Sequence, residues 1–276
     1  MNNIIEMFSY EFMQKAFITG LLISLCASLI GVSLVLRKNS MIGDGLSHVG
    51  FGAFAVAAVL GFAPIEFAIP IVMITSFFIL KLNESSKVHG DSAIALISSS
   101  SLAIGTFIIS ITKGVNTDIN NYLFGSILSV DNKDVIISII LSIAVILLYI
   151  FSYNKIFAIT FDEKFAKVVG INTKIYNIIF AFLCSIIVVL GMRLMGSLLI
   201  SSLIIFPTLS SMQIFKKFKS VVLSSTIISL TTFTLGLTLS YNFEAPTGAT
   251  IVIVNLIIFI ILKIISYIKG ETNGYN

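Results

Sequence analysis

The sequence is poor in charge. Only 11% of its 276 residues are Asp, Glu, Lys or Arg, whereas soluble domains carry about 25%. Hydrophobic residues make up 57%, and apolar runs of roughly twenty residues recur along the chain, each long enough to cross a bilayer. The runs are continuous rather than alternating, which argues against a β-barrel. The sequence therefore predicts an all-α, polytopic integral membrane protein with a single transmembrane domain over residues 1–276.

Cysteines and catalytic motifs are also scarce. The two cysteines, Cys26 and Cys184, lie inside apolar runs and are expected to pack as small residues rather than form a disulfide. The N-terminus lacks the basic segment and cleavage site of a signal peptide, so none is expected. No G-x-x-x-x-G-K-[ST] phosphate loop and no H-E-x-x-H motif occurs. We therefore expect neither ATP binding through such a loop nor a zinc protease of that type.

Nine apolar segments are candidate membrane spans. The second is short, so eight full spans with one partial element are an alternative count. In the first span Gly20, Ser24 and Ser28 recur at helical spacing, which predicts the close approach of another helix. The serine tract 98–101 predicts either a similar approach or a polar cavity. The nine segments are Phe17–Leu36, Leu46–Phe62, Ile65–Leu82, Ala93–Thr112, Val135–Tyr153, Ile175–Gly191, Ser197–Phe215, Val221–Ser240 and Thr250–Ile268.

The cations divide unevenly between the two sides of the membrane. If the first span ends in the cytoplasm and all nine segments cross, 13 of the 17 Lys and Arg residues lie inside. This distribution satisfies the positive-inside rule and places the C-terminus in the cytoplasm. The net charge of +4 then reflects topology, and no nucleic-acid partner is expected.

An aspartate and a histidine stand four residues apart in "SMIGDGLSHVG", residues 40–50. On a helix Asp44 and His48 share one face. Carboxylate oxygen and imidazole nitrogen suit zinc, manganese or ferrous iron. One chain supplies two ligands here, and a homodimer with its axis beside this helix would supply four. The pair thus predicts a binding point on the path of a transported divalent metal, with few ligands so that the ion is released.

A structural alternative remains open for the same pair. Asp44 is also a candidate N-cap of the second span, which would leave His48 in the first turn near the cytoplasmic headgroups. Both interpretations hold together if a broken helix begins inside the bilayer and points its N-terminus at the path.

A short amphipathic helix is predicted in the largest cytoplasmic loop. Phe161, Phe165, Val168 and Val169 fall on one face, with charged residues mostly opposite, and Gly170 suits the C-terminal end. Such a helix fits a membrane surface or a groove in a partner protein, and its mixed charges favour the partner. If transport is driven by ATP, the ATPase is then a separate polypeptide.

Several stretches, in order along nearly the whole chain, resemble the permease subunit of ATP-binding-cassette importers for zinc, manganese and iron. They are "LRKNSMIGDGLSHVGFGAFAVA", "FDEKFAKVVG" and "MGSLLISSLIIFPTLSS". Glu163 stands where this family commonly has proline, and Thr208 and Leu209 replace two alanines after Pro207. The stretches "TDINNYLFGSIL" and "APTGATIVIVN" look closest to the zinc branch.

The resemblance implies an assembly and a set of site residues. The assembly is a second copy of the chain, two ATPase subunits on the cytoplasmic face and an extracytoplasmic metal-binding protein, in the bacterial cytoplasmic membrane. Asp44 and His48 take the pathway positions, and Pro207 shapes a pathway helix. Residues 161–170 become the coupling helix, and the positions carried over to ATPase coupling are Phe161, Asp162, Glu163, Phe165, Ala166 and Gly170.

Three charged residues near the outer ends of spans complete the set. Arg193, Glu66 and Glu244 are candidates to contact the metal-binding protein, and equally candidates for interfacial anchors.

The expected function is therefore import of a divalent metal, zinc ahead of manganese or iron, by alternating access, with no enzymatic activity in this chain. A secondary metal transporter without an ATPase is one alternative. A permease of the same class for a larger cargo, such as a cobalamin or siderophore, is another. An intramembrane enzyme is least favoured, because no nucleophile–base pair stands out.

Overall fold

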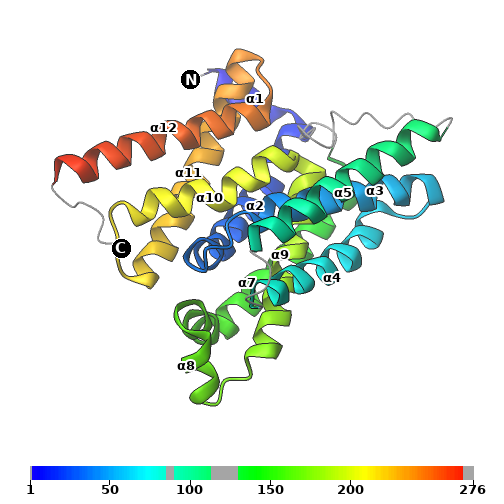
Figure 1. Ribbon diagram of the computed structural model, residues 1–276. Helices are drawn as coiled ribbons and strands as arrows, with labels where there is room; N and C mark the ends of the chain where they lie inside the picture. The colour runs from blue at the N-terminus through cyan, green and yellow to red at the C-terminus, as the bar shows by residue number, and fades with distance from the viewer. Residues whose placement is uncertain (1, 85–89, 113–129, 270–276) are drawn as a thin grey trace.

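The computed structural model describes residues 2–84, 90–112 and 130–269, and the regular structure within these ranges is helical (Figure 1). This confirms the all-α prediction. The stretch "TDINNYLFGSIL" and His89 lie outside the described residues. The helices are α1 Asn2–Ser9, α2 Glu11–Leu36, α3 Ile42–Leu60, α4 Pro64–Glu84, α5 Gly90–Ile111, α7 Asn132–Phe161, α8 Glu163–Val168, α9 Thr173–Met195, α10 Ser197–Met212, α11 Phe218–Phe243 and α12 Thr247–Ile268.

Eight helices in the described part are long and apolar enough to cross a membrane, namely α2, α3, α4, α5, α7, α9, α11 and α12. The partial element is α10, with 16 residues, and not the second segment as the sequence suggested. The second segment becomes a 19-residue helix because Ile42 to Gly45, polar and glycine-rich, are helical as well. At 1.5 Å per residue α10 is about 24 Å long, shorter than a typical hydrocarbon core.

The core is formed where α2, α9 and α10 meet. Of the spanning helices in the described part, α9 has the largest buried share, whereas α5 and α12 have the smallest. In Figure 1, α5 and α12 lie toward opposite sides of the bundle and α8 stands at the end remote from α1. A helix that is apolar on its exposed side fits contact with lipid or with a second apolar surface.

The predicted small-residue stripe of α2 is confirmed as a helix contact. A Cβ at Gly20 would overlap the ring of Phe233 on α11. The Ser229 hydroxyl donates to the Ser24 backbone oxygen at 2.9 Å, and Ser28 donates to the Thr226 hydroxyl at 3.3 Å. Small side chains thus let α2 and α11 approach closely and exchange hydrogen bonds inside the apolar zone.

The cytoplasmic end differs from the prediction in where the helices divide. Phe161 is the last residue of α7. Asp162 has an extended backbone that interrupts the helical course, and α8 begins at Glu163. The Asp162 carboxylate accepts from the Phe165 backbone N–H at 2.9 Å, so Asp162 is an N-cap rather than a residue within the helix. A capping aspartate that follows an apolar helix without a gap is not visible in hydrophobic periodicity.

Candidate metal pathway and cytoplasmic helix

Asp44 and His48 lie one turn apart at the start of α3. The His48 Nε2 atom is 3.8 Å from Asp44 Oδ2, and the two side chains keep 24% and 42% of their surface exposed. Met41, with no side-chain hydrogen bond to the helix, holds the N-cap position. The alternative that Asp44 is the cap is therefore wrong. Asp44 lies inside the first turn, where the helix dipole favours its negative charge.

The hydrogen bonds around the pair leave coordination capacity open. The Ser201 hydroxyl on α10 donates to Asp44 Oδ1 at 3.2 Å. His48 Nδ1 is buried and has no hydrogen-bond partner among the described residues. Buried polar atoms are normally paired, and an unpaired one calls for an explanation such as an absent ion or water. Ser201 was missed from the sequence, because a serine within an apolar helix gives no signal of its own.

The contacts of α2 and α3 show which part of α10 lies beside Asp44. Arg37, at the end of α2, lies six residues beyond Gly31, about 9 Å along the helix. Gly31 packs against the backbone oxygen of Ile204, and Gly43 packs against the side chain of the same residue. Asp44 bonds Ser201, which is nearly one turn farther from the cytoplasm. Asp91, in the first turn of α5, lies beside the pair as well. That α3 begins inside the bilayer as a broken helix stays a prediction.

A cavity of about 280 Å³ opens beside Asp44 and His48. Its opposite wall is α5, whose residues Asp91, Ser98 and Ser99 line it. The serine tract also packs closely on α3, since a Cβ at Gly52 would lie 2.8 Å from the Ser101 backbone oxygen. Both interpretations of the tract therefore hold. Asp91 was missed as a neighbour of the pair, and the signal was its spacing of seven and eight residues from Ser98 and Ser99.

One copy of the chain does not hold a complete metal site in its described part. No group of three or more His, Cys, Asp or Glu side chains with suitable geometry occurs in residues 2–84, 90–112 or 130–269. The prediction that Asp44 and His48 each supply a ligand accounts for two positions, and a tetrahedral ion takes four.

The helix α8 and the residue before it present an apolar surface away from the bundle. Phe161 and Phe165 are 60% and 62% exposed, and Val168 is 85% exposed, while Ala166 is fully buried against the bundle. Gly170, at φ 87°, ends the segment, with Ile171 N–H donating to the Ala166 oxygen at 3.0 Å. Exposed phenylalanines on a capped short helix suit insertion into a groove of another protein.

Of the residues expected on this helix, Glu163 faces the bundle rather than the cytoplasm. Its carboxylate lies 3.5 Å from Arg37 and 3.0 Å from Lys167, and its side chain is only 19% exposed. The charged face of the predicted amphipathic helix is therefore not merely solvated.

The sequence profile of the ABC 3 transport family matches residues 9–266. The chain belongs to the ABC 3 transport family. The eight apolar helices agree with this membership, and the chain is a multi-pass protein of the cytoplasmic membrane.

Three relatives show what the permease is similar to. It is 30% identical to the manganese import system permease protein ScaB of Streptococcus gordonii, over 91% of this chain and 90% of that one. It is 28% identical to a probable iron transport system membrane protein of Haemophilus influenzae, over 96% and 98%. The solved structure of PsaBC from Streptococcus pneumoniae in complex with Fab matches with a TM-score of 0.84 and 29% identity, over 94% and 93%. The first two are named for manganese and iron, so they do not support the expected likeness to the zinc branch.

Pro207 lies inside α10 of the permease and is buried. Proline has no backbone N–H and so removes one hydrogen bond of the helix. It does not line the cavity beside Asp44, whereas Ser201 of the same helix touches the pair. Any effect of Pro207 on the pathway therefore acts through the course of α10.

The outer charged residues separate into different roles. Arg193 makes a two-point contact with Asp134 of α7, with Nε 3.0 Å from Oδ1 and Nη2 3.2 Å from Oδ2. It thus ties α7 to α9. Glu66 is an exposed residue in the first turn of α4, with no contact that assigns it a role.

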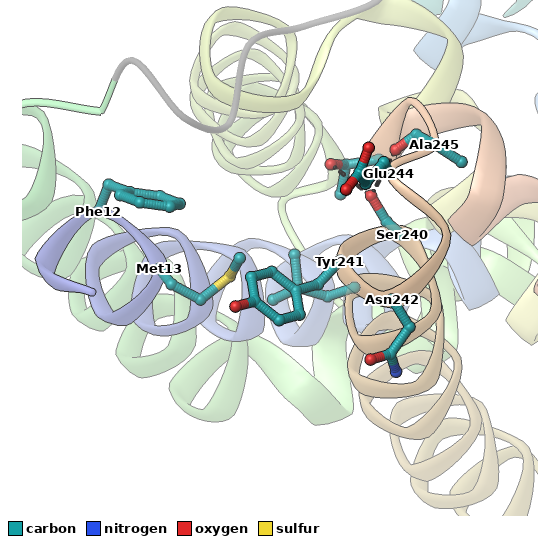
Figure 2. Close-up of a pocket in the computed structure, with 9 residues that line it drawn as sticks. Phe12, Met13, Ser240, Tyr241, Asn242, Glu244 and Ala245 are labelled. Atoms are coloured by element: carbon teal, nitrogen blue, oxygen red, sulfur yellow. Dashed lines mark hydrogen bonds between the residues drawn. The ribbon is translucent and has the colours of Figure 1, made fainter. Parts of the chain in front are cut away.

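Glu244 ends α11 in a left-handed conformation, at φ 51°. It borders an outer cavity of about 530 Å³ together with Met13 and Tyr241 (Figure 2). The Ser240 hydroxyl donates to the Ala245 backbone oxygen at 2.7 Å and fixes this turn.

Proposed function

We propose that this chain is the permease of an ATP-driven importer for a divalent transition metal, with Asp44 and His48 lining the path of the ion. One observation carries the proposal. A carboxylate and an imidazole with an unpaired buried nitrogen share a cavity between α3 and α5, in the first turns of an apolar helix of a transport-family protein. If the pair lies within the bilayer, ionisable side chains there are costly unless they meet a charged partner, and a passing cation is such a partner.

The cargo we propose is manganese or ferrous iron, ahead of zinc. Two relatives are named for manganese and iron, and nothing comparable favours the zinc branch. The ligand chemistry is compatible, because carboxylate and imidazole together suit Mn²⁺ and Fe²⁺ as well as Zn²⁺. The serine hydroxyls of the cavity add oxygen, which the harder Mn²⁺ prefers.

A second copy of the chain would complete the site. One copy offers two ligands, and the cavity that holds them is bounded by α5, of whose apolar side chains Leu96, Ile104 and Phe107 are exposed. A twofold axis beside α3 and α5 would bring two Asp–His pairs to one lumen and cover these side chains.

Two further kinds of partner belong to the proposal. The exposed face of α8 docks a separate ATPase subunit on the cytoplasmic side, through Phe161 and Phe165. A metal-binding protein delivers the ion on the outer side. The transport cycle is alternating access, in which the ion enters from outside, meets both pairs and leaves to the cytoplasm.

Radioactive manganese uptake tests this function. The permease and its ATPase are reconstituted in vesicles, and uptake is measured with and without ATP and with competing iron and zinc. We expect ATP-dependent manganese uptake that ferrous iron competes with more strongly than zinc does. Replacing both Asp44 and His48 by alanine should abolish uptake in an assembled complex. Undiminished uptake by that variant rejects the site, and full uptake without the ATPase favours a secondary transporter.

A further inference from the structure

A ring of polar side chains joins three helices at the cytoplasmic end of the bundle. Arg37, at the end of α2, lies with Nη2 3.5 Å from Glu163 Oε2 on α8. Both of its Nη atoms donate to Asn177 Oδ1 on α9, each at 3.3 Å. Asn177 in turn donates from Nδ2 to Glu163 Oε1 at 3.3 Å. Each of the three side chains therefore contacts the other two, so α2, α8 and α9 are linked at one point.

The side chains of the ring are largely shielded from water, which strengthens their electrostatic contacts. The side chains of Arg37 and Glu163 are only 13% and 19% exposed. The ring of Phe180 lies 5.7 Å from the Arg37 guanidinium carbon and covers it with an aromatic surface. Ion pairs that water reaches poorly are weakly screened, so they are worth more than surface pairs. Removing Glu163 would take away the carboxylate that joins Arg37 to α8, whereas Glu163 also pairs with Lys167 at 3.0 Å.

Arg37 is also joined to the metal pair by a short and rigid stretch of backbone. It is the C-cap of α2, and Lys38 follows in the left-handed conformation at φ 58°. Asn39 N–H then donates to the Leu34 oxygen at 2.8 Å, and Ile42 N–H donates to the Asn39 oxygen at 3.1 Å. The helix α3 starts at once with Ile42. A displacement of Arg37 is therefore carried into the first turn of α3.

The helix α8 has two faces, which would let it transmit movement from a partner protein to the bundle. Phe165 and Val168 point to the cytoplasm, and Glu163 points to Arg37. With six residues and caps at both ends, α8 is too short to bend internally. A partner that pushes on the apolar face therefore moves the carboxylate on the other face by a similar amount.

We propose that the contact of Glu163 with Arg37 is the link through which movement of α8 repositions Asp44 and His48. Glu163 and Arg37 are positioning residues in this scheme, and neither touches the ion. The proposal rests on the transport function above for its use of ATP. The link itself, from α8 through the α2–α3 turn to the pair, is a property of the chain alone.

Hydrogen–deuterium exchange on the permease in lipid nanodiscs tests the link without ATPase or metal. Glu163→Gln should raise amide exchange in the peptides that cover the α2–α3 turn and the first turn of α3, and leave α12 unchanged. Lys174→Gln is the matched control, because it also removes a charge at the cytoplasmic end but from an exposed side chain. Unchanged exchange at residues 38–48 in the Glu163→Gln variant would overturn the link.

A double-mutant cycle on the complete transporter tests its use. Metal taken up per ATP hydrolysed is measured for Arg37→Gln, Glu163→Gln and the double variant. Each single change should lower this ratio by about fivefold or more, as expected for loss of a coupling free energy, with ATP hydrolysis itself largely kept. The double variant should lower the ratio no further than each single variant does, because both single changes break the same link.

The double-mutant cycle tests the link, and its outcomes can be told apart from a failure of the proposed transport function. Additive losses, or an unchanged ratio, overturn the link. A purely structural role would lower the amount of assembled complex but not the ratio. If the wild-type complex takes up no metal, the proposed function fails, and the exchange experiment still decides whether α8 and α3 are connected.

Discussion

The two ends of α9 are held by charged contacts of different design. At the outer end the Arg193 side chain donates two hydrogen bonds, of 3.0 and 3.2 Å, to the Asp134 carboxylate. At the inner end Arg37 shares bonds of 3.3 Å with Asn177 and a contact of 3.5 Å with Glu163. A two-point contact fixes one geometry, whereas longer shared contacts change partners after a small shift. We therefore expect the outer end of α9 to stay fixed and the inner end to move.

Breaking the outer contact should have the largest effect on stability. Asp134→Ala leaves the Arg193 guanidinium without its carboxylate at a site where Asp134 is 8% exposed. Loss of one partner of a buried pair costs about 3–5 kcal/mol, which we reduce to about 2–3 because Arg193 is partly exposed. Thermal unfolding in detergent measures this, with Glu66→Gln as an exposed control. An unchanged unfolding midpoint for Asp134→Ala would mean that the contact of Arg193 with Asp134 does not hold α7 and α9 together.

Two glycines that face α10 sharpen the comparison further. A Cβ at Gly31, on the inner side, would lie 2.3 Å from the backbone oxygen of Ile204. A Cβ at Gly191, on the outer side, would lie 2.4 Å from the flexible end of Ile200. Gly31→Ala must move a backbone and should cost about 1–3 kcal/mol, whereas a side chain can turn aside for Gly191→Ala.

The same pair of variants should separate in transport. Because Ile204 and Ser201 lie on one helix, moving α10 at Gly31 displaces the partner of Asp44. Gly31→Ala should therefore lower metal uptake more than Gly191→Ala when both are compared at equal amounts of folded protein. Equal losses would show that α10 does not position Asp44.

The smallest effects are expected at two turns that hold a non-glycine residue in the left-handed conformation. Lys38 lies at the inner end with φ 58°, and Glu244 lies at the outer end with φ 51°. Glycine adopts this conformation without steric cost, so either change to glycine should alter stability by at most about 1 kcal/mol. Lys38→Gly should also loosen the α2–α3 turn and raise its amide exchange. A drop in stability above that range at either turn would show that the side chain makes contacts worth more than the strain.

Much of the fold follows from the sequence, because hydrophobic length acts locally. The nine apolar segments and the contact made by Gly20, Ser24 and Ser28 were predictable in this way. The identity of the short segment was not, since Gly43 and Gly45 look like a loop and become helical only when packed against Ile204 and α5. Helix boundaries set by such contacts lie beyond any pattern of hydropathy.

The candidate site divides in the same way. The pairing of Asp44 with His48 follows from a four-residue spacing on one helix. The contacts with Ser201 and Asp91 come from helices far along the chain and depend on tertiary packing. Glu163 was placed on the correct short helix. Its partner Arg37 is 126 residues away in the sequence, so no local spacing predicts that contact.

The binding of Mn²⁺ by Asp44 and His48 is tested most directly by pulsed electron paramagnetic resonance of the metal-loaded permease–ATPase complex. Nitrogen coupled to the manganese spin should appear in the wild-type protein and disappear in His48→Gln, with Asp44→Asn keeping the nitrogen signal but binding the metal more weakly. A nitrogen signal that is the same in His48→Gln, or no manganese retained by the wild-type complex, would contradict the account.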